Sequence, residues 1–448
     1  MPWYGYDNAK KVYKLYRLSK GILSLVVDDC YSSEQIFFKD SIILNRYDSN
    51  RNYSVVRVDS DWQVTELDTG KTITESVIRD NWIYMKAVPQ DGAGVYFLVF
   101  NGASLLRVTI SSADIRTEDI RLEDFRVCEG RVYGILPTII STGAYTTVNG
   151  RLYRFDESIA VKMPDDAWQL DLNLIESYNG QIYLSGSYKQ GTKTRYINYM
   201  STPDGLYTQL TGPKFDERDL QFEEARVEFG TLFLSGKRYN ETGKTEDILY
   251  AQRNGVWNSA LDVVGLESVT ETPLGLYLKV QDYDRATPAT KRDSLLYLGP
   301  DMSIVNAAID YEISHQSVIG QALVFAGANK LTKRTGVVSH SLEYRELIPS
   351  YAVSLWEIMP GRVFTGGRQD AVDSFRLLDA NGAKLLRDNF ETKIVAAAKV
   401  VDQFLLYGIE RDKASVWAGQ KVLYFYDMKK NTYTLLTAGV DIAEILSY

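Results

Sequence analysis

Apolar and polar residues alternate along this chain in short runs, and each run ends at residues that tolerate a tight turn. The pattern is clearest from Asn173 to Leu210, where four alternating segments follow one another. The first two segments are separated by Asn179-Gly180, and Asn-Gly between alternating runs is the strongest short hairpin signal. This stretch therefore predicts a four-stranded antiparallel meander.

The same unit recurs along the whole chain. Nine times, a Gly, Asn or Asp is followed by an apolar alternating run, at intervals of 41 to 50 residues. These three residue types tolerate the positive φ that tight hairpins need. Four strands in this period are typical of a β-propeller blade. The second strands are expected to begin at Ser41, Trp82, Arg131, Gln181, Thr231, Leu276, Gln321, Arg362 and Gln403.

The two ends of the chain match parts of a unit. Residues 12–17 and 21–25 resemble third and fourth strands, and residues 440–446 resemble a first strand. An open ring would leave sheet edges unpaired. We therefore expect an all-β fold, a single β-propeller over residues 1–448 with about nine or ten blades, in which 10–27 and 440–448 form the split closing blade. Two smaller propellers, or eight blades and one displaced unit, are the alternatives.

The repeated unit resembles β-propeller repeats in general. The Trp-Asp ending of WD40 blades and the Asp-box of sialidases are absent, and the paired glycine of kelch repeats occurs once, at Gly366-Gly367. The strand at Leu152-Tyr-Arg is similar to repeats of bacterial secreted or surface propellers. That resemblance implies a binding role at a cell surface or envelope, and it assigns no residue.

Composition narrows the partners. The 448 residues are 45% hydrophobic, and the net charge of −8 speaks against nucleic acid as the main partner. No apolar run is long enough to span a membrane. We expect a monomeric ring of unknown location, with an extracellular or envelope location favoured if a signal peptide has been removed. Cys30 and Cys128 lie in units two apart, so we expect no bond between them.

Motifs for common chemistry are missing. The chain has no His or Cys spacing typical of zinc sites, no nucleophile elbow and no phosphate-binding loop. His315 and His340 are the two histidines, and a lone histidine on a strand is usually structural. We therefore expect no metal and no cofactor, and we assign no catalytic residue.

The loops between second and third strands are the candidate binding surface, because they all emerge on one face of a propeller. Several follow a tyrosine and carry Arg, Lys or Asp, and this mixture suits recognition of a protein or glycan. The sequence thus predicts a non-catalytic binding scaffold rather than an enzyme. The residues expected to bind are Tyr47, Tyr188, Arg195, Tyr239, Tyr283 and Arg285.

Carboxylates on first strands support an alternative. First strands line the central channel of a propeller, and two carboxylates at the right separation could act as a glycoside hydrolase or polysaccharide lyase. Polar first strands that only line a wet channel explain the same pattern. A tight inward-facing cluster of acids and aromatics around a deep pocket would favour the enzyme, and an open channel with mixed charges would favour binding. The acids concerned are Glu129, Glu176, Glu224, Glu228, Glu271 and Glu357.

Overall fold

The structure is a computed structural model, and it describes most of the chain as strands. Two short 3-10 helices, η1 (Thr117–Asp119) and η2 (Leu122–Asp124), are the helices among the described residues. The expected all-β fold is confirmed. The described residues are 2–7, 12–19, 22–30, 35–47, 52–92, 94–110, 113–142, 145–156, 159–163, 171–190, 193–201, 207–209, 220–239, 245–258, 265–284, 287–308, 311–329, 331–341, 344–397 and 402–442.

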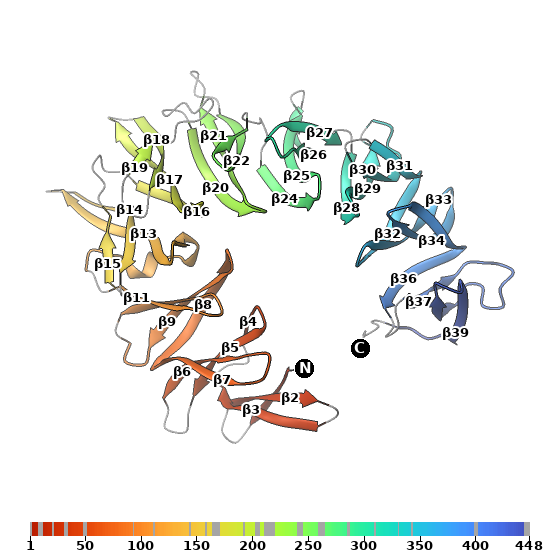
Figure 1. Ribbon diagram of the computed structural model, residues 1–448, viewed down its shortest axis with the longest axis horizontal. Coiled ribbons are helices and arrows are strands. Elements are labelled where there is room, and N and C mark those ends of the chain that lie inside the picture. Colours follow the sequence, from red (N-terminus) through yellow and green to blue (C-terminus); the bar gives the residue numbers. More distant parts are fainter. Residues whose placement is uncertain are drawn as a thin grey trace. The chain divides into compact units, whose positions relative to one another are not determined.

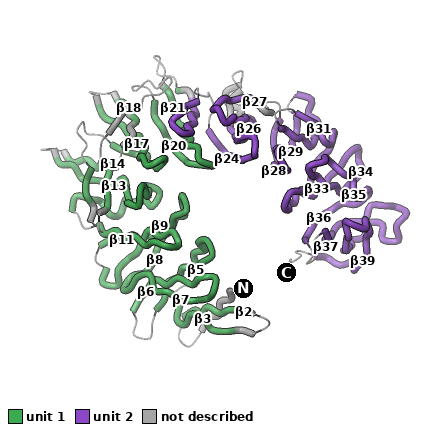
Figure 2. The backbone as a smooth tube through the Cα atoms, in the orientation of Figure 1, with its two compact units in different colours: residues 1–246 green, residues 247–448 purple. Residues whose placement is uncertain are grey.

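The chain divides into two compact units, residues 1–246 and 247–448 (Figure 2). The first sheet of unit 1 has the order β1-β2-β3-β5-β6-β7, and β4 pairs with β5 (Figure 1). Its strands are β1 (Pro2–Asp7), β2 (Val12–Ser19), β3 (Ile22–Cys30), β4 (Ile36–Phe38), β5 (Ser41–Tyr47), β6 (Tyr53–Val58) and β7 (Val64–Thr69).

The second sheet of unit 1 consists of two four-stranded meanders that share one parallel pairing, Thr109 with Ile159. The first meander is β8 (Lys71–Arg79), β9 (Trp82–Pro89), β10 (Val95–Phe100) and β11 (Leu105–Ile110). The second is β12 (Phe125–Cys128), β13 (Arg131–Thr142), β14 (Tyr145–Asp156) and β15 (Ile159–Lys162).

Two further meanders follow, and the division of the chain falls within the second. The first is β16 (Asp171–Tyr178), β17 (Gln181–Gln190), β18 (Lys193–Ser201) and β19 (Tyr207–Gln209). The next is β20 (Leu220–Glu228), β21 (Thr231–Tyr239), β22 (Thr245–Arg253) and β23 (Val256–Trp257).

Unit 2 contains four more four-stranded meanders, each in chain order. They begin with β24 (Gly265–Thr272), β25 (Gly275–Asp284), β26 (Thr287–Leu298) and β27 (Ile304–Ala308), then β28 (Tyr311–Ile319), β29 (Ala322–Asn329), β30 (Thr335–His340) and β31 (Tyr344–Pro349). They end with β32 (Tyr351–Met359), β33 (Arg362–Gln369), β34 (Val372–Asp379) and β35 (Gly382–Asp388), then β36 (Phe390–Ala397), β37 (Gln403–Glu410), β38 (Lys421–Asp427) and β39 (Thr432–Ala438).

Over the described residues, these meanders number nine, with β1 to β3 as an additional partial unit. Seven second strands begin at the predicted residue, and β25 and β29 each begin one residue away. The turns also behave as predicted, since Gly130, Gly180 and Gly230 have φ of 75°, 69° and 66°. At the first turn the prediction is wrong, because Lys39, with φ of 52°, adopts the positive φ instead of Asp40.

A bulge in the first strand is a second repeated feature. The ladder between first and second strands shifts register in seven of the nine meanders. In five of them a glycine of the second strand stands opposite the residue before the shift. A Cβ on Gly236, for example, would lie 1.9 Å from the Gln221 carbonyl oxygen. The five glycines are Gly186, Gly236, Gly327, Gly367 and Gly408.

The core lies between neighbouring meanders, as expected for blades that bury both faces. One cluster joins Tyr84 and Phe97 of β8–β11 to Phe125 and Phe155 of β12–β15. The predicted core residues Tyr183, Phe233 and Tyr277 are 2%, 1% and 1% exposed. Burial of such apolar area is the main favourable term in folding.

The predicted strands at the N-terminal end are present, whereas residues 440–442, the described part of the predicted C-terminal strand, do not form a strand. Residues 12–17 lie in β2 and residues 22–25 in β3, and both strands pack on the core of β5 and β6 through Leu15 and Val27. Residues 10, 11, 20 and 21 and residues 443–448, which the predicted closing blade includes, lie outside the described residues.

Candidate functional site

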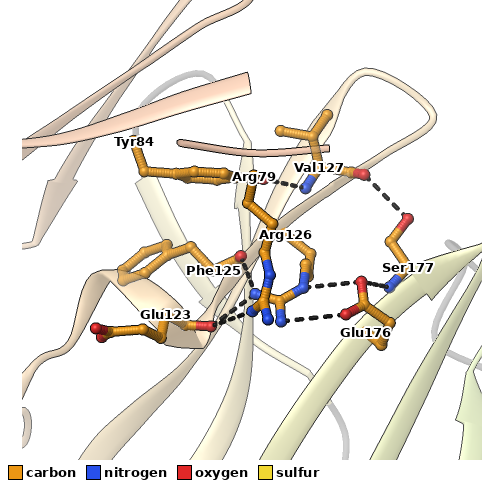
Figure 3. A network of polar contacts seen from close by, with 8 residues as sticks. All are labelled: Arg79, Tyr84, Glu123, Phe125, Arg126, Val127, Glu176 and Ser177. Carbon is orange, nitrogen blue, oxygen red and sulfur yellow. Dashed lines mark hydrogen bonds and ion pairs between the residues drawn. The ribbon is translucent and has the colours of Figure 1, made fainter. Parts of the chain in front are cut away.

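A buried ion pair marks the candidate site in unit 1. Arg126 in β12 and Glu176 in β16 face each other, with Nε 2.9 Å from Oε1 and Nη2 3.3 Å from Oε2 (Figure 3). Their side chains are 2% and 1% exposed. The pair therefore connects the first strands of two neighbouring meanders, and it does so out of contact with water.

The hydrogen-bonding capacity of both side chains is used locally. Arg126 Nη1 donates to the carbonyl oxygens of Glu123 and Phe125, each at 2.6 Å. Glu176 Oε1 also accepts from the backbone N–H of Ser177 at 2.9 Å. A buried ion pair is tolerated only when such additional bonds satisfy both partners. This saturation indicates a structural role for the Glu176 carboxylate.

The backbone of Val127 extends this network across a third meander. Its N–H donates to the Tyr84 hydroxyl of β9 at 3.1 Å, and its carbonyl accepts from Ser177 Oγ at 3.0 Å (Figure 3). Burial raises the pKa of Tyr84 above its ordinary value, so the hydroxyl stays protonated. The network therefore ties the first strands β12 and β16 to β9.

A pocket of about 380 Å³ lies beside this network. Three arginines and four carboxylates line it, and none of the described lining residues is aromatic. The pocket is therefore of mixed charge over the residues that the structure describes. The lining residues are Arg79, Arg121, Glu123, Asp124, Arg126, Asn173, Leu174, Ile175, Glu223, Glu224 and Ala225.

Most charges in the pocket already have partners. Asp124 accepts from Arg121 Nε at 3.1 Å, and Glu223 lies 2.8 Å from Lys237 Nζ. Burial raises the pKa of the Asp124 carboxyl, and the Arg121 guanidinium partly opposes that rise. Glu224 accepts a hydrogen bond from Ser235 Oγ at 3.4 Å.

The four predicted first-strand acids of unit 1 do not form one cluster. Glu224 lines the pocket, whereas Glu176 is buried behind Arg126. Glu129 lies in the turn before β13, and Glu228 is paired with Arg226 at 3.2 Å. The remaining two, Glu271 in β24 and Glu357 in β32, belong to unit 2.

The predicted binding residues that the structure describes lie where second and third strands meet. Tyr188 of β17 stands directly opposite Arg195 of β18, and both are half-buried. Tyr47, at the end of β5, has its ring 5.1 Å from that of Tyr53. The side chains of Tyr239 and Tyr283, and the whole of Arg285, lie outside the described residues.

The histidines and cysteines fit structural roles. His340 Nδ1 lies 2.7 Å from the buried Tyr277 hydroxyl, and burial lowers the pKa of His340. His315 stacks on Trp356 with ring centroids 5.8 Å apart. Cys30 and Cys128 are both buried and free, which confirms that they are not bonded to each other. Within the described ranges, no group of three His, Cys, Asp or Glu is placed to hold a metal ion.

The sequence did not reveal the pocket, although it contained one signal of it. The interval from Trp82 to Arg131 is 49 residues, against 41 from Ser41 to Trp82. Additional residues lie between β11 and β12, and they include η1 and η2. This segment contributes Arg121, Glu123 and Asp124 to the pocket. The long interval therefore indicated where the additional residues lie, but it did not indicate that they line a pocket.

No protein-family model matches the chain, and no curated protein matches it. Among solved structures, the β-propeller domain of the trilobed protease from Pyrococcus furiosus is 12% identical, with a TM-score of 0.31, and the match covers 72% of this chain and 99% of that one. Acylaminoacyl peptidase from Pyrococcus horikoshii is 10% identical, with a TM-score of 0.29 and coverage of 76% and 58%. Tricorn protease is 9% identical, with a TM-score of 0.28 and coverage of 97% and 46%.

These similarities concern β-propeller architecture and no specific family. The chain spans 58% of the acylaminoacyl peptidase and 46% of tricorn protease. The repeated four-stranded meanders support the propeller resemblance by themselves. Among the described residues, no helix is long and apolar enough to cross a membrane.

Proposed function

We propose that the chain is a non-catalytic binding scaffold that recognises a protein or glycan through its loops between second and third strands. One observation carries this proposal. Glu176, the most buried of the six first-strand acids, is saturated by Arg126 and Ser177 and cannot reach a substrate. The pocket beside it has mixed charge and no described aromatic side chain.

The strand ends supply the surface that binding needs. Tyr188 and Arg195 are paired across β17 and β18, so their backbone is held by the sheet. Side chains on loops positioned by such a rigid scaffold are a common location for recognition. Tyrosine offers a large contact area at low cost in side-chain entropy. The proposed binding residues therefore remain Tyr47, Tyr188, Arg195, Tyr239, Tyr283 and Arg285.

The test compares loop variants on a glycan array and a displayed library of random peptides. Tyr188→Ala and Arg195→Glu should each abolish most binding while leaving the thermal unfolding midpoint unchanged. Asp61→Ala is the control, because Asp61 is exposed in a turn between third and fourth strands. Binding that survives both loop variants would show that Tyr188 and Arg195 are not part of the binding surface, and the absence of any glycan or peptide that binds would contradict the scaffold itself.

A second candidate is hydrolysis or lyase cleavage of a polysaccharide. Asp124 and Glu224 line one pocket, and burial raises the pKa of Asp124, as a general acid requires. In this case Glu224→Gln would abolish the release of reducing ends from a polysaccharide without weakening binding. Such turnover would replace the scaffold as the proposed function.

A further inference from the structure

The two most exposed large apolar side chains that the structure describes lie on equivalent loops of unit 2. Leu331 is 76% exposed in the β29–β30 loop, and Val416 is 83% exposed in the β37–β38 loop. Between them in sequence, Val372 is 41% exposed at the β33–β34 turn. All three segments join a second strand to a third strand in consecutive meanders.

Hydrogen bonds and ion pairs place these three loops along one edge of unit 2. Gln369 Nε2, at the end of β33, donates to the Pro349 carbonyl at 3.0 Å, and Pro349 pairs with Gly336, beside the β29–β30 loop. On the other side, Asp373 lies 3.8 Å from both Arg368 and Arg411. The β33–β34 turn is thus connected to both neighbouring loops.

Backbone hydrogen bonds order the β37–β38 loop, which carries Val416. Its backbone is closed by hydrogen bonds from Gly419 to Glu410 at 2.7 Å and from Gln420 to Trp417 at 2.9 Å. Trp417 packs on the core of the last two meanders, while its neighbour Val416 faces water. The loop is therefore ordered while it keeps an aliphatic side chain in water.

Unpaired cations accompany the apolar tips. Lys333 and Arg334 are exposed beside Leu331, and Lys413 is exposed beside Val416. Within the described residues, none of these three side chains forms an ion pair or a hydrogen bond. Over residues 331–335, 368–373 and 411–421, six Lys and Arg outnumber three Asp, so these loops are opposite in net charge to the whole chain, which carries −8.

We propose that these three loops of unit 2, residues 331–335, 368–373 and 411–421, are a docking surface for an acidic segment of a partner protein. The segment would place aliphatic side chains against Leu331, Val372 and Val416, and carboxylates against Lys333, Arg334 and Lys413. Complementary charge speeds association and selects against basic partners. The inference rests on the proposed binding function. It specifies which unit and which loops bind, and it specifies that the partner segment is acidic and aliphatic.

The experiment selects a phage-displayed library of random peptides against the full chain. Two variants then dissect the binding of the selected peptides: Leu331→Ser with Val416→Ser removes the apolar tips, and Lys333→Glu, Arg334→Glu and Lys413→Glu together reverse the charge. Matched controls are Val305→Ser, at an exposed aliphatic residue of β27, and Lys384→Glu, at an exposed lysine of β35. Thermal unfolding of every variant shows that the fold is retained.

We expect the selected peptides to be enriched in Asp, Glu and aliphatic residues, and to bind more weakly as salt rises. Each loop variant should lose about tenfold or more in affinity, since central contacts carry most of the binding energy. The two controls should bind as the native chain does. Peptides that are neutral or basic, or that bind the loop variants equally well, would overturn the inference.

The outcomes also separate this inference from the proposed function. Peptides that lose binding on Tyr188→Ala or Arg195→Glu, but not on the loop variants of unit 2, would overturn the docking surface and leave the scaffold standing. If no peptide is selected while a glycan binds, the inference fails alone. If neither a peptide nor a glycan binds, both fail.

Discussion

Removal of one partner of the Arg126–Glu176 pair leaves the other as an unpaired buried charge. Arg126→Met should therefore reduce the free energy of unfolding by about 3–5 kcal/mol. Adding Glu176→Leu should recover most of that loss, because the double variant buries no charge. Urea unfolding of the two single variants and the double variant measures the coupling energy between the side chains.

The control for this cycle is Arg121→Met. The Arg121 side chain is 68% exposed and pairs with Asp124 near the surface. Exposed pairs contribute about 0–1 kcal/mol, so this substitution should have little effect. Equal losses at Arg121 and Arg126 would contradict the structural role of the buried pair.

The two thiols should be unreactive in the folded protein. Burial raises the pKa of Cys30 to about 11 and also raises the pKa of Cys128. The thiolate is the reactive form, so both residues should alkylate slowly at pH 8 and rapidly once the chain is unfolded. Mass spectrometry after brief labelling measures this. Rapid labelling of the native protein would show that the segments around them open.

Asp124 should make stability depend on pH. Burial raises the pKa of Asp124 in the folded state above its ordinary value of 3.8, so the folded chain holds this proton more tightly than the unfolded chain does. The free energy of unfolding therefore has its full Asp124 contribution below pH 3.8 and loses it as pH rises through the folded-state pKa. Asp124→Asn removes this loss. The variant should match the native chain at acid pH and become the more stable of the two towards neutral pH. Unfolding measured across that range checks the sign, and an opposite trend would contradict the burial effect.

At the scale of single residues, the sequence predicted the core better than the polar network. Tyr183, Phe233 and Tyr277 are buried because alternation assigns each strand residue to a face. Arg126 carries a charge, and alternation alone would place a charged residue in water. Its burial depends on Glu176, 50 residues further on, and no local pattern encodes such a pairing.

At the scale of strands and turns, the repeated glycine of the second strand makes a bulge possible. Gly236→Ala would bring a Cβ to 1.9 Å from the Gln221 carbonyl, so strand β20 would have to shift. Overpacking of this kind costs about 1–3 kcal/mol, and we expect a corresponding fall in the midpoint of unfolding. Gly265→Ala is the control, because no atom lies within 4 Å of the position of its Cβ. An unchanged unfolding midpoint for Gly236→Ala would show that strand β20 can shift at the bulge with little cost in stability.

The hairpin turns were predictable and the bulges were not. A turn is encoded by the residue that adopts positive φ, as at Gly180 and Gly230. A bulge leaves the hydrophobic pattern nearly intact, and its one sign is a glycine in the middle of the facing strand. Such a glycine recurs in five second strands, from Gly186 to Gly408. It predicts a bulge only when the register between the first and second strands is known.

At the scale of the whole molecule, the spacing of the turns predicted the number of meanders, because each turn is a local signal. Closure of a ring depends on how the two ends meet, and no local signal reports this. We propose that the chain is one ring over residues 1–448, closed by residues 10–27 with residues 440–448. The proposal rests on the partial unit β1 to β3, on the sequence pattern of residues 440–446 and on the cost of unpaired sheet edges.

Deletion of residues 10–27 tests ring closure through its effect on distant strands. The deletion removes Leu15 and Val27 from the core that they share with Leu44 and Val56, so faster amide exchange in β5 and β6 is expected in any case. Closure predicts in addition that β36 to β39 exchange faster, because their sheet would lose its closing partner. Hydrogen exchange read by mass spectrometry reports both regions in one experiment, with β24 to β27 as the internal control. If amide exchange becomes faster only in β5 and β6, residues 10–27 stabilise only the first sheet. That result would favour two separate propellers over one ring.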